Sequence, residues 1–157
     1  MTAAGRPAAV TTEVEFHTGV ADKVGFACRL LRKAYRRGAR VLVTGPRDVL
    51  ALLDRALWTF DPTDFTPHRR LAPGAPAPAR FAATPVWLFE AGEAPLQASP
   101  VHEVLVNLGP DAVPGFESFE RVLEIVGRDT NAADAGRRRW RHYAERGYAV
   151  VHHQGAA

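Results

Sequence analysis

The sequence predicts an α/β protein with a mostly parallel central sheet. Short apolar segments alternate with amphipathic segments of helical length over the first 60 residues. This strand, helix, strand, helix order favours parallel strands that are joined by right-handed crossovers. The 157 residues contain no internal repeat and no change of composition that would divide them. We therefore expect one domain over residues 11–153, after a disordered segment at 1–10 and before a tail at 154–157.

The first half of the chain has distinct element boundaries. Glu13–His17 alternates polar and apolar residues, which is typical of a strand. Asp22 can cap a helix whose apolar residues recur at helical spacing until Gly38 ends it. Val41–Val43 is a short apolar run, which suits a strand that is covered on both faces. Pro46 then begins a second helix, because proline is favoured in the first helical turn.

The second half is predicted less sharply. Leu71–Ala79 is rich in Pro, Ala and Gly, and we expect a surface loop there. Apolar spacing predicts a short helix at 119–126. The remaining expected elements are strands at 86–89, 104–107 and 148–152, and a longer helix at 131–146.

Composition predicts a globular protein of the cytoplasm. Apolar residues make up 46% of the chain, but no apolar run approaches the roughly 20 residues that span a bilayer. The first residues lack the basic and apolar regions of a secretory signal. The single cysteine, Cys28, fits a reducing compartment.

The net charge of +3 arises in the last part of the chain. Residues 1–130 carry equal numbers of basic and acidic residues, whereas 131–157 carry five arginines and two acids. Within that part, Arg137–Tyr143 interleaves guanidinium groups with aromatic rings on a predicted helix. A guanidinium binds carboxylate or phosphate through two hydrogen bonds, and a ring adds an apolar contact. The helix is therefore a candidate site for an anionic, partly apolar partner, although packing of Trp140 and Tyr143 into the core is the alternative.

A second candidate surface lies at Leu57–His68. This segment follows a helix that already has an apolar stripe, and it adds three aromatic residues on a stretch interrupted by proline. Trp and Phe that are exposed together are typical of a protein interface. The alternative is a loop packed over a sheet edge.

The residues contain no pattern for catalysis, for a metal or for a cofactor. The turn at Thr44–Asp48 lacks both glycine-rich phosphate motifs, and Pro46 removes an N–H that a phosphate would use. None of the six histidines has H-E-x-x-H spacing, and one cysteine allows no cysteine-based zinc site. We interpret His152 and His153 as solvated residues, and Cys28 as a packed thiol.

Several short motifs follow one another along the chain. They are E-F-H at 15–17, G-A-R-V-L-V at 38–43, L-W at 57–58, F-x-P-H at 65–68, F at 116, E-I-V at 124–126, R-x-x-W-R-x-Y at 137–143 and G-Y at 147–148. Their order and spacing resemble the chi subunit of bacterial DNA polymerase III. The resemblance runs from about Glu13 to His152.

This resemblance implies a fold, a function and two partners. The family fold is a three-layer α/β/α sandwich, and the family has no known catalytic role or cofactor. Its members link two proteins of the replication machinery. One is the psi subunit, which connects chi to the clamp loader. The other is single-stranded DNA-binding protein (SSB), whose acidic C-terminal tail ends in Pro-Phe.

The resemblance also implies site residues. The family's tail pocket combines a valine on one helix with an arginine and an aromatic residue of the last helix, and these match Val126, Arg137 and Trp140. The family usually has tyrosine at the aromatic position, so Trp140 keeps the apolar face and lacks the hydroxyl. The tail site also includes Arg141 and Tyr143. The implied psi-binding residues are Trp58, Phe65, Pro67 and His68.

The other arginines of the last helix allow a second hypothesis. We expect Arg138, Arg139 and Arg141 to attract the acidic residues of the tail at longer range. Arginines interleaved with Trp and Tyr could instead bind single-stranded nucleic acid directly. The neutrality of residues 1–130 argues against a groove of positive charge that follows a strand.

Overall fold

The computed structural model describes residues 11–59, 61–71, 77–90, 96 and 99–154. The disordered segment predicted at 1–10 and most of the loop predicted at 71–79 lie outside these residues. The elements within them are β1 (Glu13–Val20), α1 (Lys23–Arg36), β2 (Val41–Gly45), α2 (Arg47–Thr59), β3 (His68–Arg70), η2 (Ala79–Phe81), β4 (Val86–Glu90), β5 (Val104–Asn107), η4 (Phe116–Ser118), β6 (Arg121–Gly127), α3 (Thr130–Glu145) and β7 (Val150–Gln154). No helix of this described part is both long and apolar enough to cross a membrane.

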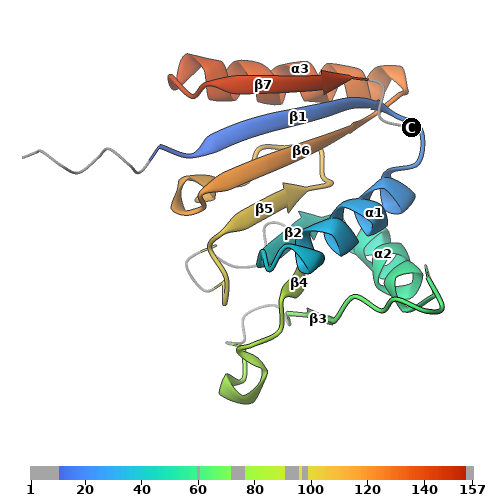
Figure 1. The fold of residues 1–157 in the computed structure, drawn as a ribbon. Coiled ribbons are helices and arrows are strands. Elements are labelled where there is room, and N and C mark those ends of the chain that lie inside the picture. The colour runs from blue at the N-terminus through green and yellow to red at the C-terminus, as the bar shows by residue number, and fades with distance from the viewer. Residues whose placement is uncertain (1–10, 60, 72–76, 91–95, 97–98, 155–157) are drawn as a thin grey trace, which may run out of the picture.

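The strands form one sheet in the order β3-β4-β2-β5-β6-β1-β7. Every strand pair in it is parallel, which confirms the α/β prediction. The first strand, β1, lies between β6 and β7, so the first and last strands of the described chain pair at one edge of the sheet (Figure 1). Val14 of β1 aligns with Val122 of β6 and Val150 of β7.

Helices cover the sheet on both faces, so the fold is the expected three-layer α/β/α sandwich. Helices α1 and α2 pack together near β2 and β4, whereas α3 runs alongside β7 and packs on β6, β1 and β7 (Figure 1). Alternate strand residues enter two separate cores. Val41 and Val43 contribute to the core beneath α1 and α2, whereas Leu42 contributes to the core beneath α3.

The short helix predicted at 119–126 is wrong, because this segment contains the strand β6. Four of its residues recur at helical spacing, but the run from Val122 to Val126 is rich in β-branched side chains that favour a strand. A central parallel strand is apolar on both faces, so its pattern does not alternate. Val126 therefore lies on a strand and not on a helix.

Local signals place the ends of α1 and α3. Asp22 accepts a hydrogen bond from the N–H of Gly25 at 3.0 Å, and Asp129 accepts one from Ala132 at 2.8 Å. These bonds satisfy N–H groups that the first helical turn leaves unpaired. After α3, β7 begins at Val150, two residues later than predicted, and it ends at Gln154. Gln154, which was predicted to begin a tail, is therefore part of the strand.

Candidate protein-binding sites

A cavity of about 400 Å³ opens between α3 and the edge of the sheet formed by β6, β1 and β7. We call it the β7-edge cavity. It brings together three of the predicted tail-binding residues, Val126, Arg137 and Trp140. The residues that line it are Phe16, Thr18, Gly19, Val126, Gly127, Arg128, Ala133, Gly136, Arg137, Trp140, His152 and Gln154.

The inner wall of this cavity is apolar. The rings of Phe16 and Trp140 lie with their centroids 5.1 Å apart. Gly136 lets α3 approach β6 closely, because a Cβ at this position would lie 2.9 Å from Cγ1 of Val126. The cavity thus offers aliphatic and aromatic contacts side by side, along two turns of α3.

Arg137 lies at the rim of the cavity and is 66% exposed at its side chain. Its guanidinium forms an ion pair with Asp134 on the preceding turn. Ion pairs between exposed side chains contribute about 0–1 kcal/mol. Exchange of Asp134 for the carboxylate of a ligand therefore costs little.

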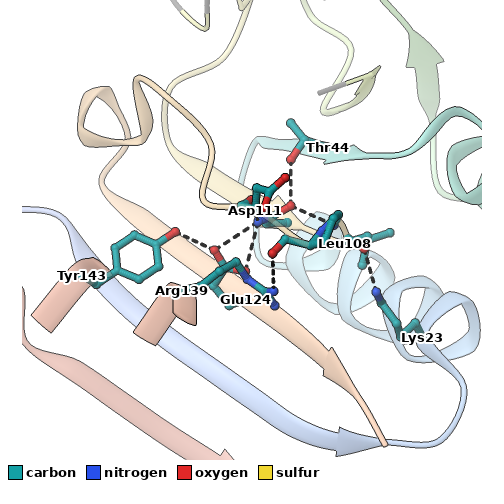
Figure 2. A network of polar contacts seen from close by, with 10 residues as sticks. Lys23, Thr44, Leu108, Asp111, Glu124, Arg139 and Tyr143 are labelled. Carbon is teal, nitrogen blue, oxygen red and sulfur yellow. Dashed lines mark hydrogen bonds and ion pairs between the residues drawn. The ribbon is translucent and has the colours of Figure 1, made fainter. Parts of the chain in front are cut away.

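Arg139 points the opposite way from Arg137 and is buried. Its Nε donates to Oε1 of Glu124 at 2.7 Å, and its Nη1 donates to the carbonyl of Pro110 at 2.9 Å (Figure 2). Glu124 lies on β6 and is completely buried. The expectation that Arg139 supplies a surface charge for the tail is therefore wrong.

Tyr143 belongs to the same buried network and does not line the cavity. It is 0% exposed, and its hydroxyl donates to Oε2 of Glu124 at 2.5 Å (Figure 2). Asn107 donates its amide to the same carboxylate at 3.1 Å. In the structure Tyr143 fixes α3 to β6, while Trp140 is the aromatic residue of the helix that faces the cavity.

The network keeps its carboxylate in an unusual environment. Complete burial raises the pKa of Glu124, and the charge of Arg139 opposes that rise. Burial and the nearby carboxylate raise the pKa of Tyr143, so its hydroxyl stays a donor. A buried ion pair that loses one partner destabilises a protein by about 3–5 kcal/mol. The position of α3, and with it the rim of the cavity, depends on this pair.

The other arginines of α3 face solvent. Arg138 and Arg141 are exposed and do not line the cavity. Arg141 is thus placed beside the predicted tail site and not within it. Arg128, which precedes α3, does line the cavity and is also exposed.

A second cavity, of about 300 Å³, lies at the opposite edge of the sheet and is called the β3-edge cavity. All four predicted psi-binding residues line it: Trp58, Phe65, Pro67 and His68. Trp58 is 62% exposed and Phe65 is 43% exposed. Their rings stack with centroids 4.9 Å apart, so they form one projecting apolar surface.

His68 supports this surface from below. Its side chain is buried, with Nε2 2.9 Å from Oδ1 of Asp54 and Nδ1 2.9 Å from the carbonyl of Thr66. The ring lies edge-on to Trp58, with centroids 5.3 Å apart. The structure therefore gives His68 a positioning role, whereas Trp58 and Phe65 are the accessible side chains.

Ion pairs fix the segment that carries Phe65 to α1. Arg32 contacts Asp61 at 2.7 Å, and Arg36 contacts Asp64. The backbone N–H of Thr63 hydrogen-bonds to Asp61 and lowers the pKa of that carboxyl. These contacts hold Phe65 against Trp58 before any partner arrives.

Comparison with known proteins identifies the family. The sequence profile described as "DNA polymerase III chi subunit, HolC" matches residues 11–151. The chain belongs to the DNA polymerase III chi subunit family. A relative named DNA polymerase III subunit chi, from Pseudomonas aeruginosa, is 34% identical over 130 residues, covering 82% of this chain and 83% of its own. Another of that name, from Haemophilus influenzae, is 28% identical over 124 residues, covering 78% and 80%.

Sequence reasoning missed several cavity residues of this chi-family chain. Phe16 and Thr18 on β1, and Gln154 on β7, form a wall only because the two ends of the chain pair in the sheet. No local sequence pattern predicts that pairing. Gly136 did carry a signal, because a glycine inside a helix costs about 1 kcal/mol relative to alanine and requires a reason.

Proposed function

We propose that this chi-family protein is a non-catalytic adaptor of the DNA replication machinery. It links the clamp loader, through the psi subunit, to the C-terminal tail of SSB. The β7-edge cavity is the tail site, and the β3-edge cavity is part of the psi-binding surface. Nucleic acid is reached only through SSB.

The observation that carries this proposal is the joint placement of Val126, Trp140 and Arg137 at one cavity. A tail that ends in phenylalanine presents a ring and a free carboxylate within one residue. The ring needs an apolar slot, and the carboxylate needs a guanidinium at its entrance. Val126 and Trp140 supply the first, and Arg137 supplies the second.

The β3 edge suits a partner of a different kind. Trp58 and Phe65 project from the surface as stacked rings. Exposed aromatic residues of this kind are frequent binding hot spots, where a few side chains supply most of the affinity. A lasting partner such as a clamp-loader subunit would bury both rings.

A titration with an acidic peptide that ends in Pro-Phe tests the tail site. We expect Arg137→Ala to weaken binding by well over tenfold, because the loss of a charge-paired guanidinium costs about 2–5 kcal/mol when its partner is left desolvated. Arg138→Ala is the matched control, because it removes the same charge from the neighbouring exposed position. It should weaken binding much less and mainly lower the association rate.

Two further arms separate a specific site from a basic surface. Deletion of the terminal Phe of the peptide should be about as harmful as Arg137→Ala, and added salt should weaken the intact peptide by screening its acidic residues. Equal effects of Arg137→Ala and Arg138→Ala, with no effect of the Phe deletion, would contradict the proposal. Direct binding of single-stranded nucleic acid would then be the better explanation.

A further inference from the structure

Three potential metal ligands meet at the same sheet edge, on the face opposite the β7-edge cavity. They are Glu15 and His17 of β1 and His153 of β7. The parallel register pairs His17 directly with His153, so their side chains lie on the same face. That face carries α1, because the ring of His17 also packs against Phe26 of that helix.

The two distances from the histidines to Glu15 are close to those between ligands of a tetrahedral ion. Nε2 of His17 lies 3.4 Å from Oε1 of Glu15, and Nε2 of His153 lies 3.6 Å from the same oxygen. One ligand atom from each of the three residues lies within 4.8 Å of the others. Ligands held at about 2.0–2.1 Å from Zn²⁺ with tetrahedral angles are separated by about 3.3–3.4 Å. The rings of His17 and His153 stack with centroids 4.9 Å apart and planes 19° from parallel, so both rings must turn to direct their Nε2 atoms at one ion.

The surroundings also suit a metal site. Arg121 donates to the other oxygen of Glu15, Oε2, at 2.6 Å, which fixes the carboxylate and leaves Oε1 facing the histidines. Carboxylates that ligate metals are commonly oriented by such a hydrogen bond. The side chain of His153 is 53% exposed, which gives an ion access from solvent.

We propose that Glu15, His17 and His153 bind one divalent transition-metal ion, with Zn²⁺ as the best fit. Two imidazoles and a carboxylate are a ligand set that Zn²⁺ takes up, and a solvent molecule completes the tetrahedron. The ion ties the edge strand β7 to β1. Because His152 and Gln154 on the other face of β7 line the β7-edge cavity, the ion braces a wall of that cavity from behind.

Metal titration of the full chain tests the site directly. The protein is used without a polyhistidine tag and is first treated with a chelator. Zn²⁺ is followed by calorimetry, and Co²⁺ is followed by the visible absorption of a tetrahedral complex. We expect one ion per chain and a rise in melting temperature, because a ligand that binds only the folded state stabilises it.

Variants on the two faces of β7 decide the assignment. His153→Ala and His17→Ala should each weaken binding of Zn²⁺ at least tenfold and abolish the rise in melting temperature. His152→Ala is the matched control, since it removes the adjacent histidine on the opposite face and should bind as the wild type does. His153 is exposed, so its loss leaves folding in chelator unchanged. The proposal is overturned if wild type takes up no ion, if His152→Ala loses as much as His153→Ala, or if binding survives removal of both His17 and His153.

Discussion

The two edges of the sheet differ in how they meet a partner. At the β7 edge, Val126 and Trp140 lie inside a cavity and Arg137 stands at its rim. At the β3 edge, Trp58 and Phe65 project from the surface. One edge offers a cavity, whereas the other presents exposed side chains. The two sites lie at opposite edges of the sheet, as the proposed function of linking two partners requires.

The support beneath the two sites differs as well. The β7-edge cavity depends on a buried ion pair, Arg139 with Glu124, which fixes α3. The β3-edge surface depends on partly exposed pairs between α1 and residues 61–64. Buried and exposed pairs differ severalfold in energy. Substitutions should therefore separate the two edges by the size of their effects.

The largest effect is expected for Arg139→Ala. It leaves Glu124 buried without its ion-pair partner, so the free energy of unfolding should fall by about 3–5 kcal/mol. Denaturant unfolding measures this, and Arg138→Ala should stay within about 0.5 kcal/mol of wild type. The double variant Glu124→Gln, Arg139→Met should be more stable than Arg139→Ala. It leaves no buried charge, and the Gln side chain still accepts a hydrogen bond from Tyr143. Equal stability of Arg139→Ala and Arg138→Ala would refute a structural role for the pair.

The double variant Trp58→Ala, Phe65→Ala should have the next largest effect. Loss of one hot-spot residue costs about 2 kcal/mol or more, and the effects of two such residues do not add in full, so association with the clamp loader should weaken at least roughly 30-fold. Binding of the tail peptide should not change, because the other edge is intact. Leu52→Ala provides a control, as Leu52 is an exposed apolar residue of the same helix that does not line the cavity. If the double variant still co-purifies with the clamp loader as well as wild type does, the β3 edge is not the clamp-loader site.

Gly136→Ala should act on the β7 edge alone. The added methyl group meets Val126 at 2.9 Å, so α3 or the valine must move. Overpacking of this kind costs about 1–3 kcal/mol, and we expect the tail peptide to bind about tenfold more weakly. Stability should change less than binding, because alanine favours the helix by about 1 kcal/mol. Peptide titration beside denaturant unfolding checks this, and unchanged peptide affinity would contradict a close fit.

The smallest effect, and a gain, is expected for Asp134→Asn. It releases Arg137 from its ion pair and removes a negative charge that faces an acidic tail. Exposed pairs contribute about 0.2–1 kcal/mol, so peptide affinity should rise by roughly 1.4- to 5-fold, with less gain at high salt. Peptide titration at two salt concentrations measures it. Weaker binding would mean that Asp134 positions the guanidinium and does not compete for it.

The sequence predicted most of the fold because its signals there are local. Asp22 and Gly38 mark the ends of α1 within a few residues of the structure. The strand β6 was missed because an apolar run that is buried on both faces also satisfies helical spacing. Glu124 within that run was a usable signal, because a buried acid requires a buried cation. Arg139 was the candidate for that buried cation, because it lies four residues before Tyr143, on the same face of α3.

The residues of the candidate sites were also predicted only in part. Val126, Arg137 and Trp140, which the resemblance assigns to a tail pocket, line one cavity, and the four residues that it assigns to psi binding line another. Binding of either partner at these residues stays a prediction. The resemblance did not distinguish an exposed residue from a supporting one, as with Tyr143 and His68. The cluster of Glu15, His17 and His153 could not be found by motif spacing, since its members are far apart in sequence and meet only through strand pairing.

The position of β1 between β6 and β7 also governs the order of events during synthesis. Within the described residues, the strand partners of β1 are β6 and β7, and its first N–H, that of Glu13, donates to the carbonyl of Glu120. A nascent chain that leaves the ribosome must therefore carry β1 unpaired until β6 and β7 have been made. Contacts of such long sequence separation slow folding and leave an exposed strand edge in the meantime. The pairing of β1 with β7 also forms a wall of the β7-edge cavity, so that site cannot form before β7 has been synthesised.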